Sequence, residues 1–436
     1  MKTKLLYINV FIMIFFSSII GGTILGLSLN KLCILPLYIY LFITTLHMHG
    51  RIKIKKSILV FILFYFASAI SAVYSLSASY SKMDGYVSRS AFYAIQAICI
   101  YIPLIILLYN HPSKDRITDA TIKAIIITFR INIIIAIIEF LSFFVLDITV
   151  TKLILSIFYG AEAAPALINL MPLGIFIRPT GLNMDPAYLG IILVFGFLFE
   201  KNNNWKLAAF LVALIAMSRT AVIVMAVAYF YDRGLKKITV KSLLFVMFGI
   251  ALFGILLMVS EGFRNQLTGL LDRFNLSSQV NSADSGTMRH LLYIPKAIEA
   301  FFFHYKPLQM LIGFGPRQSG TILAQIGLMD AYLNPEMFVE PWTLECDMAE
   351  LLLGYGIIGF ILYFYNIFQL RKLGKQGKTI FLIIVLYSIM YDISAATFVQ
   401  LIIIICLCCF HKSDCQAAAM PELAQHHMRI KIRWRR

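Results

Sequence analysis

The sequence predicts an all-α integral membrane protein that crosses a lipid bilayer about twelve times. The 436-residue chain is 60% hydrophobic, and its mean hydropathy is +0.82, which excludes a soluble enzyme of this length. Apolar runs recur from one end of the chain to the other, and a spanning helix needs about 20 mostly apolar residues. Basic residues gather in the connections on one side of these runs, as the positive-inside rule describes.

The apolar runs are each predicted to form a spanning helix. The first begins after Lys2 and Lys4. We expect it to be an uncleaved anchor, because the run is too long for a signal peptide and no small-residue cleavage site follows it. The predicted spans are 5–28, 32–48, 57–76, 90–109, 122–146, 186–200, 206–217, 220–232, 242–259, 347–368, 379–393 and 397–411.

The connection between 206–217 and 220–232 decides the topology. A single helix through 206–232 would bury Arg219 in mid-membrane and invert the orientation of every later span. A hairpin instead leaves most of the 38 lysines and arginines on the inner side. The short outer loops then hold few basic residues, namely Lys31, Lys82, Arg89 and Arg219. We therefore predict the hairpin, with both chain termini on the cytoplasmic side.

The net charge of +16 follows from these basic inner segments. Basic residues beside spanning helices are attracted to an anionic inner leaflet, so the charge does not require a nucleic-acid partner. The 7 cysteines lack metal-ligand spacing and are predicted to be packing thiols. We expect membrane lipids as partners, and we expect neither a metal nor a cofactor.

Two outer segments, 147–185 and 260–346, are longer than the other connections. Loops of this length are usually functional or disordered, and apolar runs in the second one favour a folded cap of helices. The predicted organisation is a transmembrane domain, 1–411, with the cap 260–346 inserted within it. A basic cytoplasmic tail, 412–436, follows and is assigned no chemistry.

Charges inside the predicted spans are rare and costly. Arg130 and Glu139 both fall in the span 122–146, at a separation that does not place them on one helix face. We expect Arg130 to extend its side chain toward the inner interface.

Arginines occur in the segments that are not predicted to lie in the lipid. Arg178 opens the segment Arg178-Pro179-Thr180-Gly181, after which Asp185 and Pro186 suit the N-cap and first turn of a helix. We expect Arg178 and Asp185 to lie on an ordered turn at the outer surface and to bind substrate. The alternative for Arg178 is an interfacial anchor.

Two further arginines lie at a turn and at a helix start. Arg219 follows Ser218 in the tight outer turn, where an arginine suggests bidentate binding of a phosphate or carboxylate. Arg289 follows Ser285 in a helical stretch of the cap, and the first amides of that helix would favour an anion. Arg219 and Arg289 are therefore candidates for both catalysis and substrate binding.

The segment Gly313-Phe314-Gly315-Pro316-Arg317 lacks the spacing and the preceding strand of a nucleotide-binding loop. We interpret it as a tight turn, and Arg317 at its end is a further candidate for substrate binding.

Three carboxylates, Glu345, Asp347 and Glu350, meet the outer end of the span 347–368. A carboxylate beside a low-dielectric surface is suited to general-base chemistry. Glu345 and Asp347 are the candidate catalytic bases, and the alternative is that they complement the helix dipole.

In their order and sidedness, these segments resemble the O-antigen polymerase/ligase superfamily of bacterial envelope glycosyltransferases. Arg178-Pro179-Thr180-Gly181 with Asp185-Pro186 resembles the family's R-x-x-G-x-x-x-D-P, and Ser218-Arg219 resembles its S-R turn. Ser285 to Arg289, followed by Gly313-Phe314-Gly315, resembles the start of the family's long periplasmic loop. Gly356-Ile357-Ile358-Gly359 resembles the G-x-x-G after that loop, so the resemblance covers roughly 170–360.

The resemblance implies a GT-C-like fold in the bacterial inner membrane and a role in O-antigen, lipopolysaccharide or related surface polysaccharide biosynthesis. Its donor and acceptor would be undecaprenyl-pyrophosphate-linked glycans at the periplasmic face. Arg219 and Arg289 would stabilise the leaving pyrophosphate, and Arg178 would assist them or bind the acceptor's pyrophosphate. Glu345 or Asp347 would take the proton of the acceptor hydroxyl.

One departure from the family pattern separates a polymerase of repeat units from a ligase to lipid A-core. Ligases of the family carry a histidine about eleven residues before the first glycine of G-x-x-G. Counting back from Gly356 reaches Glu345, and no histidine occurs between His304 and His411. This favours the polymerase. Whether a partner protein regulates chain length stays open.

The alternative from another class is a transporter or flippase of a lipid-linked sugar. It predicts mid-membrane charges on broken helices and internal repeats.

Overall fold

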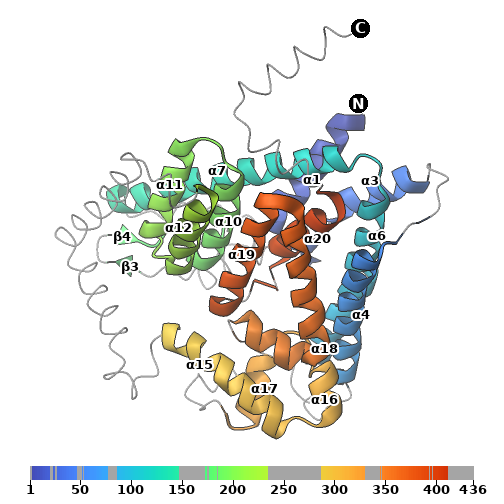
Figure 1. Ribbon diagram of the computed structural model, residues 1–436. Helices are drawn as coiled ribbons and strands as arrows, with labels where there is room; N and C mark the ends of the chain where they lie inside the picture. The colour runs from blue at the N-terminus through green and yellow to red at the C-terminus, as the bar shows by residue number, and fades with distance from the viewer. Residues whose placement is uncertain are drawn as a thin grey trace.

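The computed structural model describes residues 2–19, 23–24, 27–46, 52, 54–76, 86–146, 172–173, 176–183, 185–233, 286–328, 344, 346–391, 393–394 and 396–410. Within these ranges the protein is all-helical apart from two small antiparallel ladders (Figure 1). The ladders are β1 (Thr23–Ile24) with β2 (Leu27–Ser28), and β3 (Pro172–Leu173) with β4 (Phe176–Ile177).

The N-terminal half contributes α1 (Lys2–Ser17), α2 (Leu29–Leu32), α3 (Leu35–Leu46), α4 (Lys56–Leu76), α5 (Tyr86–Ile95), the π-helix η2 (Gln96–Tyr101), α6 (Ile102–Asn110) and α7 (Lys114–Leu146). The middle of the chain contributes α10 (Pro186–Phe199), α11 (Asn203–Ile215), α12 (Arg219–Arg233), α15 (Gly286–Glu299), the π-helix η4 (Ala300–His304), α16 (Pro307–Ile312) and α17 (Ser319–Gln325). The last helices are α18 (Asp347–Gln369), the 3₁₀ turn η6 (Leu370–Leu373), α19 (Gly374–Met390) and α20 (Thr397–Cys409).

Each predicted span coincides with a helix or a run of helices, except 242–259, which lies outside the described residues. The first span is shorter than predicted, since α1 ends at Ser17 and not at position 28. The hydroxyls of Ser17 and Ser18 donate to the carbonyl oxygens of Ile14 and Phe15 and so satisfy acceptors at the end of this helix.

Four described segments are long and apolar enough to cross a membrane: Lys56–Leu76, Ser90–Asn110, Lys114–Phe143 and Asp347–Met390. The other apolar helices have 10–17 residues. They are shorter than a typical span, which has about 20 residues. The transmembrane character therefore has structural support, whereas the count of twelve and the GT-C-like fold stay predictions.

One face of α4 shows the surface that a lipid-embedded helix presents. Leu59, Leu63, Phe66, Ile70 and Val73 recur at helical spacing and are between 44% and 56% exposed. The opposite face packs against α18 and α5. A helix that is apolar on both its buried and its exposed face is typical of a membrane span.

The hairpin at the α11–α12 connection is confirmed. Helix α11 ends at Ile215, and α12 begins at Arg219. Met217 has φ 51°, a left-handed conformation that reverses the chain between the two helices. Arg219 therefore lies at a helix start and not in the middle of a single long helix.

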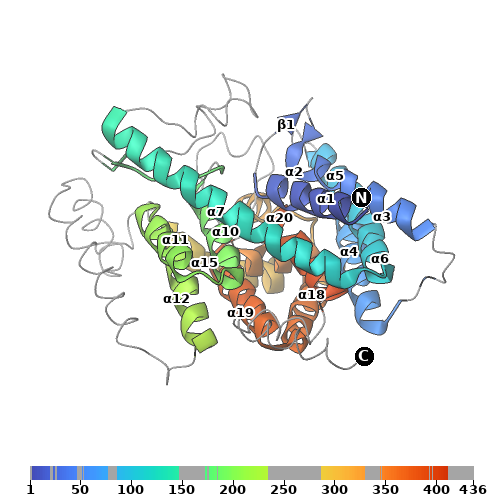
Figure 2. The same cartoon turned by 90° about the horizontal axis from the view of Figure 1, so that it is seen from above.

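The helices pack around one large core and one smaller core. In the large core α7 runs between α1 and α10, and Figure 2 shows α7 crossing the bundle with α1–α3 on one side and α10–α12 on the other. In the smaller core Tyr293, Phe301, Tyr305 and Phe314 pack on the first turns of α18. Helices α15–α17, which we call the cap, lie at the opposite end of the molecule from the N-terminus (Figure 1). The predicted periplasmic cap 260–346 extends beyond the described residues and stays a prediction.

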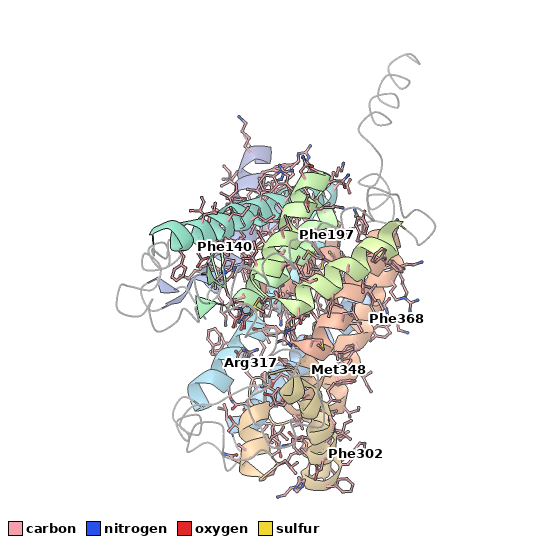
Figure 3. All side chains as sticks on the ribbon, turned by 90° about the vertical axis from the view of Figure 1, so that its left-hand side faces the viewer. Phe140, Phe197, Phe302, Arg317, Met348 and Phe368 are labelled. Atoms are coloured by element: carbon pink, nitrogen blue, oxygen red, sulfur yellow. The ribbon has the colours of Figure 1, made fainter. Side chains whose placement is uncertain are left out.

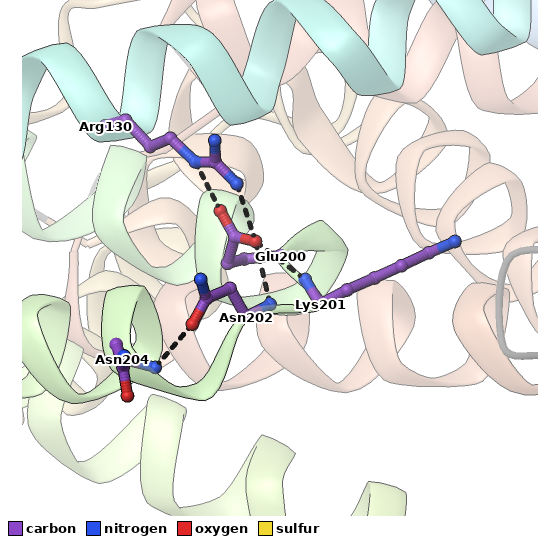
Figure 4. A network of polar contacts seen from close by, with 5 residues as sticks. All are labelled: Arg130, Glu200, Lys201, Asn202 and Asn204. Carbon is purple, nitrogen blue, oxygen red and sulfur yellow. Dashed lines mark hydrogen bonds and ion pairs between the residues drawn. The ribbon is translucent and has the colours of Figure 1, made fainter. Parts of the chain in front are cut away.

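A bidentate ion pair joins α7 to the end of α10 (Figure 4). Arg130 donates from Nε and Nη2 to the two carboxylate oxygens of Glu200 at 2.7 and 3.0 Å. Glu200 also accepts from the amides of Lys201 and Asn202, which lead into α11. Arg130 therefore pairs with Glu200 and not with Glu139, in agreement with their predicted separation on α7.

Helix α18 is interrupted at Gly356. Gly356 has φ 65°, so the carbonyl oxygens of Leu353 and Gly354 lose their helical donors. The amides of Phe314 and Gly315 replace those donors at 3.0 and 2.9 Å. A Cβ at Gly313 would lie 2.3 Å from the Gly354 oxygen, so this close approach requires glycine. The segment 313–315 is thus a backbone clasp on the broken helix, a more specific role than the tight turn expected from sequence.

Candidate functional site

Three of the predicted site residues, Arg178, Asp185 and Arg219, lie at one end of α10, α11 and α12. Asp185 caps α10 by accepting a hydrogen bond from the amide of Ala187 at 2.6 Å, and Pro186 occupies the first helical position. The N-cap prediction is therefore confirmed. This N-cap fixes the residue at which α10 begins.

Arg178 connects this cap to the α11–α12 turn. Its Nε donates to the carbonyl oxygen of Ala216 at 3.1 Å. Burial lowers the pKa of the Arg178 guanidinium, and the charge of Asp185 opposes that shift. Arg178 is therefore a half-buried cation between the start of α10 and the α11–α12 turn, two segments that are separate in the sequence.

The turn that carries Arg219 packs tightly on α10. A Cβ at Gly190, in the second turn of α10, would lie 2.4 Å from the Ser218 Oγ. Gly190 therefore allows Ser218 and Arg219 to approach the helix that begins at Asp185. The side chain of Arg219 is half-buried.

Two buried polar residues of α7 hold the segment that follows Arg178. Glu139 Oε2 accepts from the amides of Thr180 and Gly181 at 2.9 and 3.2 Å. Asn132 Oδ1 accepts from the amide of Leu182 at 3.1 Å. Glu139 and Asn132 are 0% exposed, so they supply acceptors to backbone groups that water does not reach.

Glu139 and Asn132 were not assigned to the site from sequence. They lie seven positions apart, which returns to nearly the same face of a helix. An ionisable residue within a span is a candidate for a functional role by default. The position of Glu139 within the span 122–146 was therefore the signal that could have assigned it to the site. Its partner amides in 180–181 are invisible in the sequence.

Asp347 is fully buried at the start of α18. Its carboxylate accepts from the amide of Ser394 at 2.8 Å and from the hydroxyl of Ser388 at 3.1 Å. The amide of Asp347 donates to the Tyr391 carbonyl at 3.4 Å. These contacts fasten α18 to the end of α19 and to the connection that follows it.

Glu350 plays a parallel part on the cap side. Its carboxylate accepts from the amide of Arg317 and from the hydroxyl of Ser319. Arg317 has φ 66°, a conformation that is uncommon for a residue with a side chain. Figure 3 shows Arg317 and Met348 lying between Phe140 and Phe197 at one end and Phe302 at the other.

A tyrosine pair links the arginine segment to the carboxylate segment. The rings of Tyr188, one turn after Asp185, and Tyr391 meet edge to face with centroids 5.6 Å apart. The backbone carbonyl oxygen of Tyr391 also accepts a hydrogen bond from the amide of Asp347. The beginnings of α10 and α18, distant in sequence, therefore lie beside each other at one end of the bundle.

Among the candidates from sequence, Arg178, Asp185 and Arg219 come together through these contacts. Asp347 lies next to them through Tyr391, and Arg317 belongs to the neighbouring cap contact with Glu350. Arg289 lies in the first turn of α15, but its side chain is outside the described set, as is the whole of Glu345.

In the comparisons with known proteins, no protein-family model and no curated protein matches this chain.

Proposed function

We propose that the protein is a membrane glycosyltransferase that polymerises undecaprenyl-pyrophosphate-linked oligosaccharide repeat units. The reaction takes place at the periplasmic face of the bacterial inner membrane. The proposal joins the resemblance of the motifs to the spatial arrangement of their residues. The enzyme acts on two lipid-linked glycans, one as donor and one as acceptor.

The contact between Arg178 and Ala216 carries the proposal. It places the Arg178-Pro179-Thr180-Gly181 segment against the turn that presents Arg219, with a 3.1 Å hydrogen bond from Nε. Two guanidinium-bearing segments at one end of a helical bundle suit a ligand with a diphosphate group.

The proposed chemistry needs cations at the leaving group. The bond between the donor's anomeric carbon and the pyrophosphate oxygen breaks, and a bond from that carbon to the acceptor hydroxyl oxygen forms. The electron pair leaves with undecaprenyl pyrophosphate, whose growing charge Arg219, Arg178 and Arg289 stabilise. The hydroxyl proton passes to a carboxylate acting as general base.

Glu345 is the better candidate for that base. The carboxylate oxygens of Asp347 already accept hydrogen bonds from Ser394 and Ser388 in a fully buried position. A base must present an oxygen to the acceptor hydroxyl. Asp347 is therefore proposed as a positioning residue that holds the start of α18 beside the arginine segment.

Deletion of the gene and complementation test the proposal. The surface polysaccharide should collapse from a ladder to a single capped repeat unit on a gel, and the wild-type gene should restore the ladder. Complete loss of attached glycan would favour the ligase in place of the polymerase. An unchanged ladder would exclude both.

A transporter of a lipid-linked sugar is the second candidate, because α18 is broken at Gly356 as transporter helices often are. Against it, the freed carbonyls of Leu353 and Gly354 are taken by amides of the cap. Transport assays on vesicles distinguish the two. Movement of a labelled lipid-linked sugar across the bilayer, without change in glycan length, would support the transporter.

A further inference from the structure

The cap exposes a group of large apolar side chains. Phe302 and Phe303 on η4 are 63% and 81% exposed, and Leu308 and Leu311 on α16 are 51% and 47% exposed. Figure 3 shows Phe302 at the outer surface of the cap. A single exposed apolar side chain needs no explanation, whereas four of them on two successive short helices indicate an interaction surface. We call these four residues the apolar edge.

The apolar edge is tied to the broken helix α18. Tyr305, which lies between η4 and α16, donates from its hydroxyl to the Leu353 carbonyl oxygen at 3.0 Å. The backbone oxygen of Leu311 lies beside Gly356, where a Cβ would approach it to 2.5 Å. Both helices of the apolar edge are therefore held at the level of the break in α18.

Helix α4 gives the depth of that break in the membrane. The hydroxyl of Ser71 donates to the Gly354 carbonyl oxygen, and a Cβ at Gly315 would lie 2.6 Å from the Ser75 Cβ. Helix α4 begins at the exposed Lys56 and has 21 residues, a length of about 31 Å. Because the hydrocarbon core of a bilayer is about 30 Å thick, α4 needs its full length to cross it. Its last two turns, which hold Ser71 and Ser75, therefore lie within the outer leaflet of the predicted topology.

The apolar surface of α4 continues into the apolar edge. Ile70 and Val73 on these last turns are 55% and 56% exposed, and α16 packs on both α4 and α18. On α18, Ile358 and Ile361 are 42% and 57% exposed just after the break. An apolar surface that runs from two long apolar helices onto a short helix beside them suits hydrocarbon better than water.

The backbone at the break receives all its donors from the protein. The carbonyl oxygen of Leu353 accepts from the Phe314 amide and from the Tyr305 hydroxyl. The carbonyl oxygen of Gly354 likewise accepts from an amide of the clasp and from a hydroxyl of α4. A break in contact with water would not need these donors, because water would supply them. Non-helical backbone at membrane depth, by contrast, must be satisfied within the protein.

Polar side chains lie at the margin of the apolar edge. His304 and Lys306 are exposed in the connection between η4 and α16, and Glu299 is exposed one turn before Phe303. A lysine at such a margin can lay its hydrocarbon stem on the apolar surface and extend its charge to the lipid phosphates. An apolar face with charged groups at its margin is typical of a helix that lies in a membrane interface.

We propose that the apolar edge is inserted in the outer leaflet of the bilayer, where its four side chains contact lipid acyl chains. The cap is then partly embedded in the membrane and does not stand clear of it in the aqueous phase. The partner of this surface is the hydrocarbon of the bilayer, and not a second copy of the chain or another protein. The proposal goes beyond the polymerase function and does not depend on it.

Photo-cross-linking of the full-length protein in liposomes tests the insertion. The photoreactive residue p-benzoyl-phenylalanine replaces Phe303, whose exposure allows the change without repacking, and the liposomes contain phosphatidylcholine with radiolabelled acyl chains. The same residue at Ile70 on α4 is the positive control, and at Asn204, exposed in the first turn of α11, it is the negative control. We expect lipid adducts at Phe303 in a yield similar to that at Ile70 and about tenfold above that at Asn204.

Two results of this experiment would overturn the proposal. One is a yield of lipid adduct at Phe303 no higher than at Asn204, while Ile70 reacts with lipid. The other is cross-linking from Phe303 to a second copy of the protein in place of lipid, seen as a dimer on a denaturing gel. Neither result bears on the polymerase, which is decided by the polysaccharide ladder.

Thermal unfolding in nanodiscs supplies a second measurement. Phe303→Glu should lower the unfolding midpoint by about 2–4 °C, because a carboxylate replaces an apolar ring in lipid. Phe303→Leu should leave the midpoint unchanged. Asn204→Glu is the matched control, since it adds the same charge at an exposed position outside the cap. An unchanged or raised midpoint in Phe303→Glu would contradict the insertion.

Discussion

Arg178 Nε donates to the carbonyl oxygen of Ala216 at 3.1 Å and so joins two segments that are separated by all of α10 and α11. The charge of Asp185, the N-cap of α10, opposes the lowering of the pKa of the same guanidinium by burial. One side chain therefore fixes the mutual position of a helix start and a helix turn. The proposed diphosphate site depends on that position.

Two substitutions of Arg178 distinguish the effect of its charge from the effect of its planar hydrogen-bonding geometry. Arg178→Ala should abolish the polysaccharide ladder while the protein remains in the membrane, because both the cation and the bond to Ala216 are lost. Arg178→Lys keeps the charge but not the planar fork, and should leave short chains. Ladder length on a gel measures both effects. Lys201→Ala, an exposed cation at the other end of α10, is the control, and a full ladder in Arg178→Ala would contradict the assignment.

We expect Glu139 to act through the hydrogen bonds that its side chain accepts and not through its negative charge. Glu139→Gln keeps a carbonyl oxygen for the amides of Thr180 and Gly181 and should retain most of the ladder. Glu139→Ala leaves two buried amides without an acceptor, at about 1–3 kcal/mol each, and should lower both thermal stability and ladder length.

The control for Glu139→Ala is Ile138→Ala, at a 46% exposed position on the same helix. It should change neither property. If Glu139→Gln lost the ladder as completely as Glu139→Ala, the carboxylate would have a chemical role in addition to its structural one.

Two glycines with similar φ angles allow the cost of backbone strain to be compared with the cost of a steric clash. Gly313 has φ 77° and would place a Cβ 2.3 Å from the Gly354 oxygen, whereas Gly327 has φ 73° and nothing within 4 Å. Gly327→Ala should cost only the left-handed conformation, about 1–2 kcal/mol. Gly313→Ala should cost more, because the clasp on α18 must open. Thermal unfolding in detergent compares the two, and equal shifts would argue against the clasp.

The two candidate bases make opposite predictions. Asp347→Asn can still accept from the amide of Ser394 and should keep substantial activity, because Asp347 positions α18. Glu345→Gln should lose the ladder while its abundance in the membrane is unchanged. Rates of chain extension in membranes measure the difference. Loss of activity in Asp347→Asn with unaltered thermal stability would make Asp347 the base.

The sequence predicted the helices because hydrocarbon imposes a strong pattern on each span. It also predicted the Asp185 cap and the turn at Arg219, since both depend on residues adjacent in the chain. It did not predict that Arg178 binds Ala216 or that Glu139 holds Thr180 and Gly181, because these contacts join distant segments. The break at Gly356 was likewise hidden, since its replacement donors come from the cap.

Extension of a lipid-linked glycan by the purified protein tests the central claim most directly. The substrate is the single repeat unit on its lipid, extracted from the deletion strain, and the protein is reconstituted in liposomes. The account predicts longer glycans with release of undecaprenyl pyrophosphate, and loss of both products in Arg178→Ala and Arg219→Ala. Glycans of unchanged length with the wild-type protein, or equal extension by both variants, would contradict it.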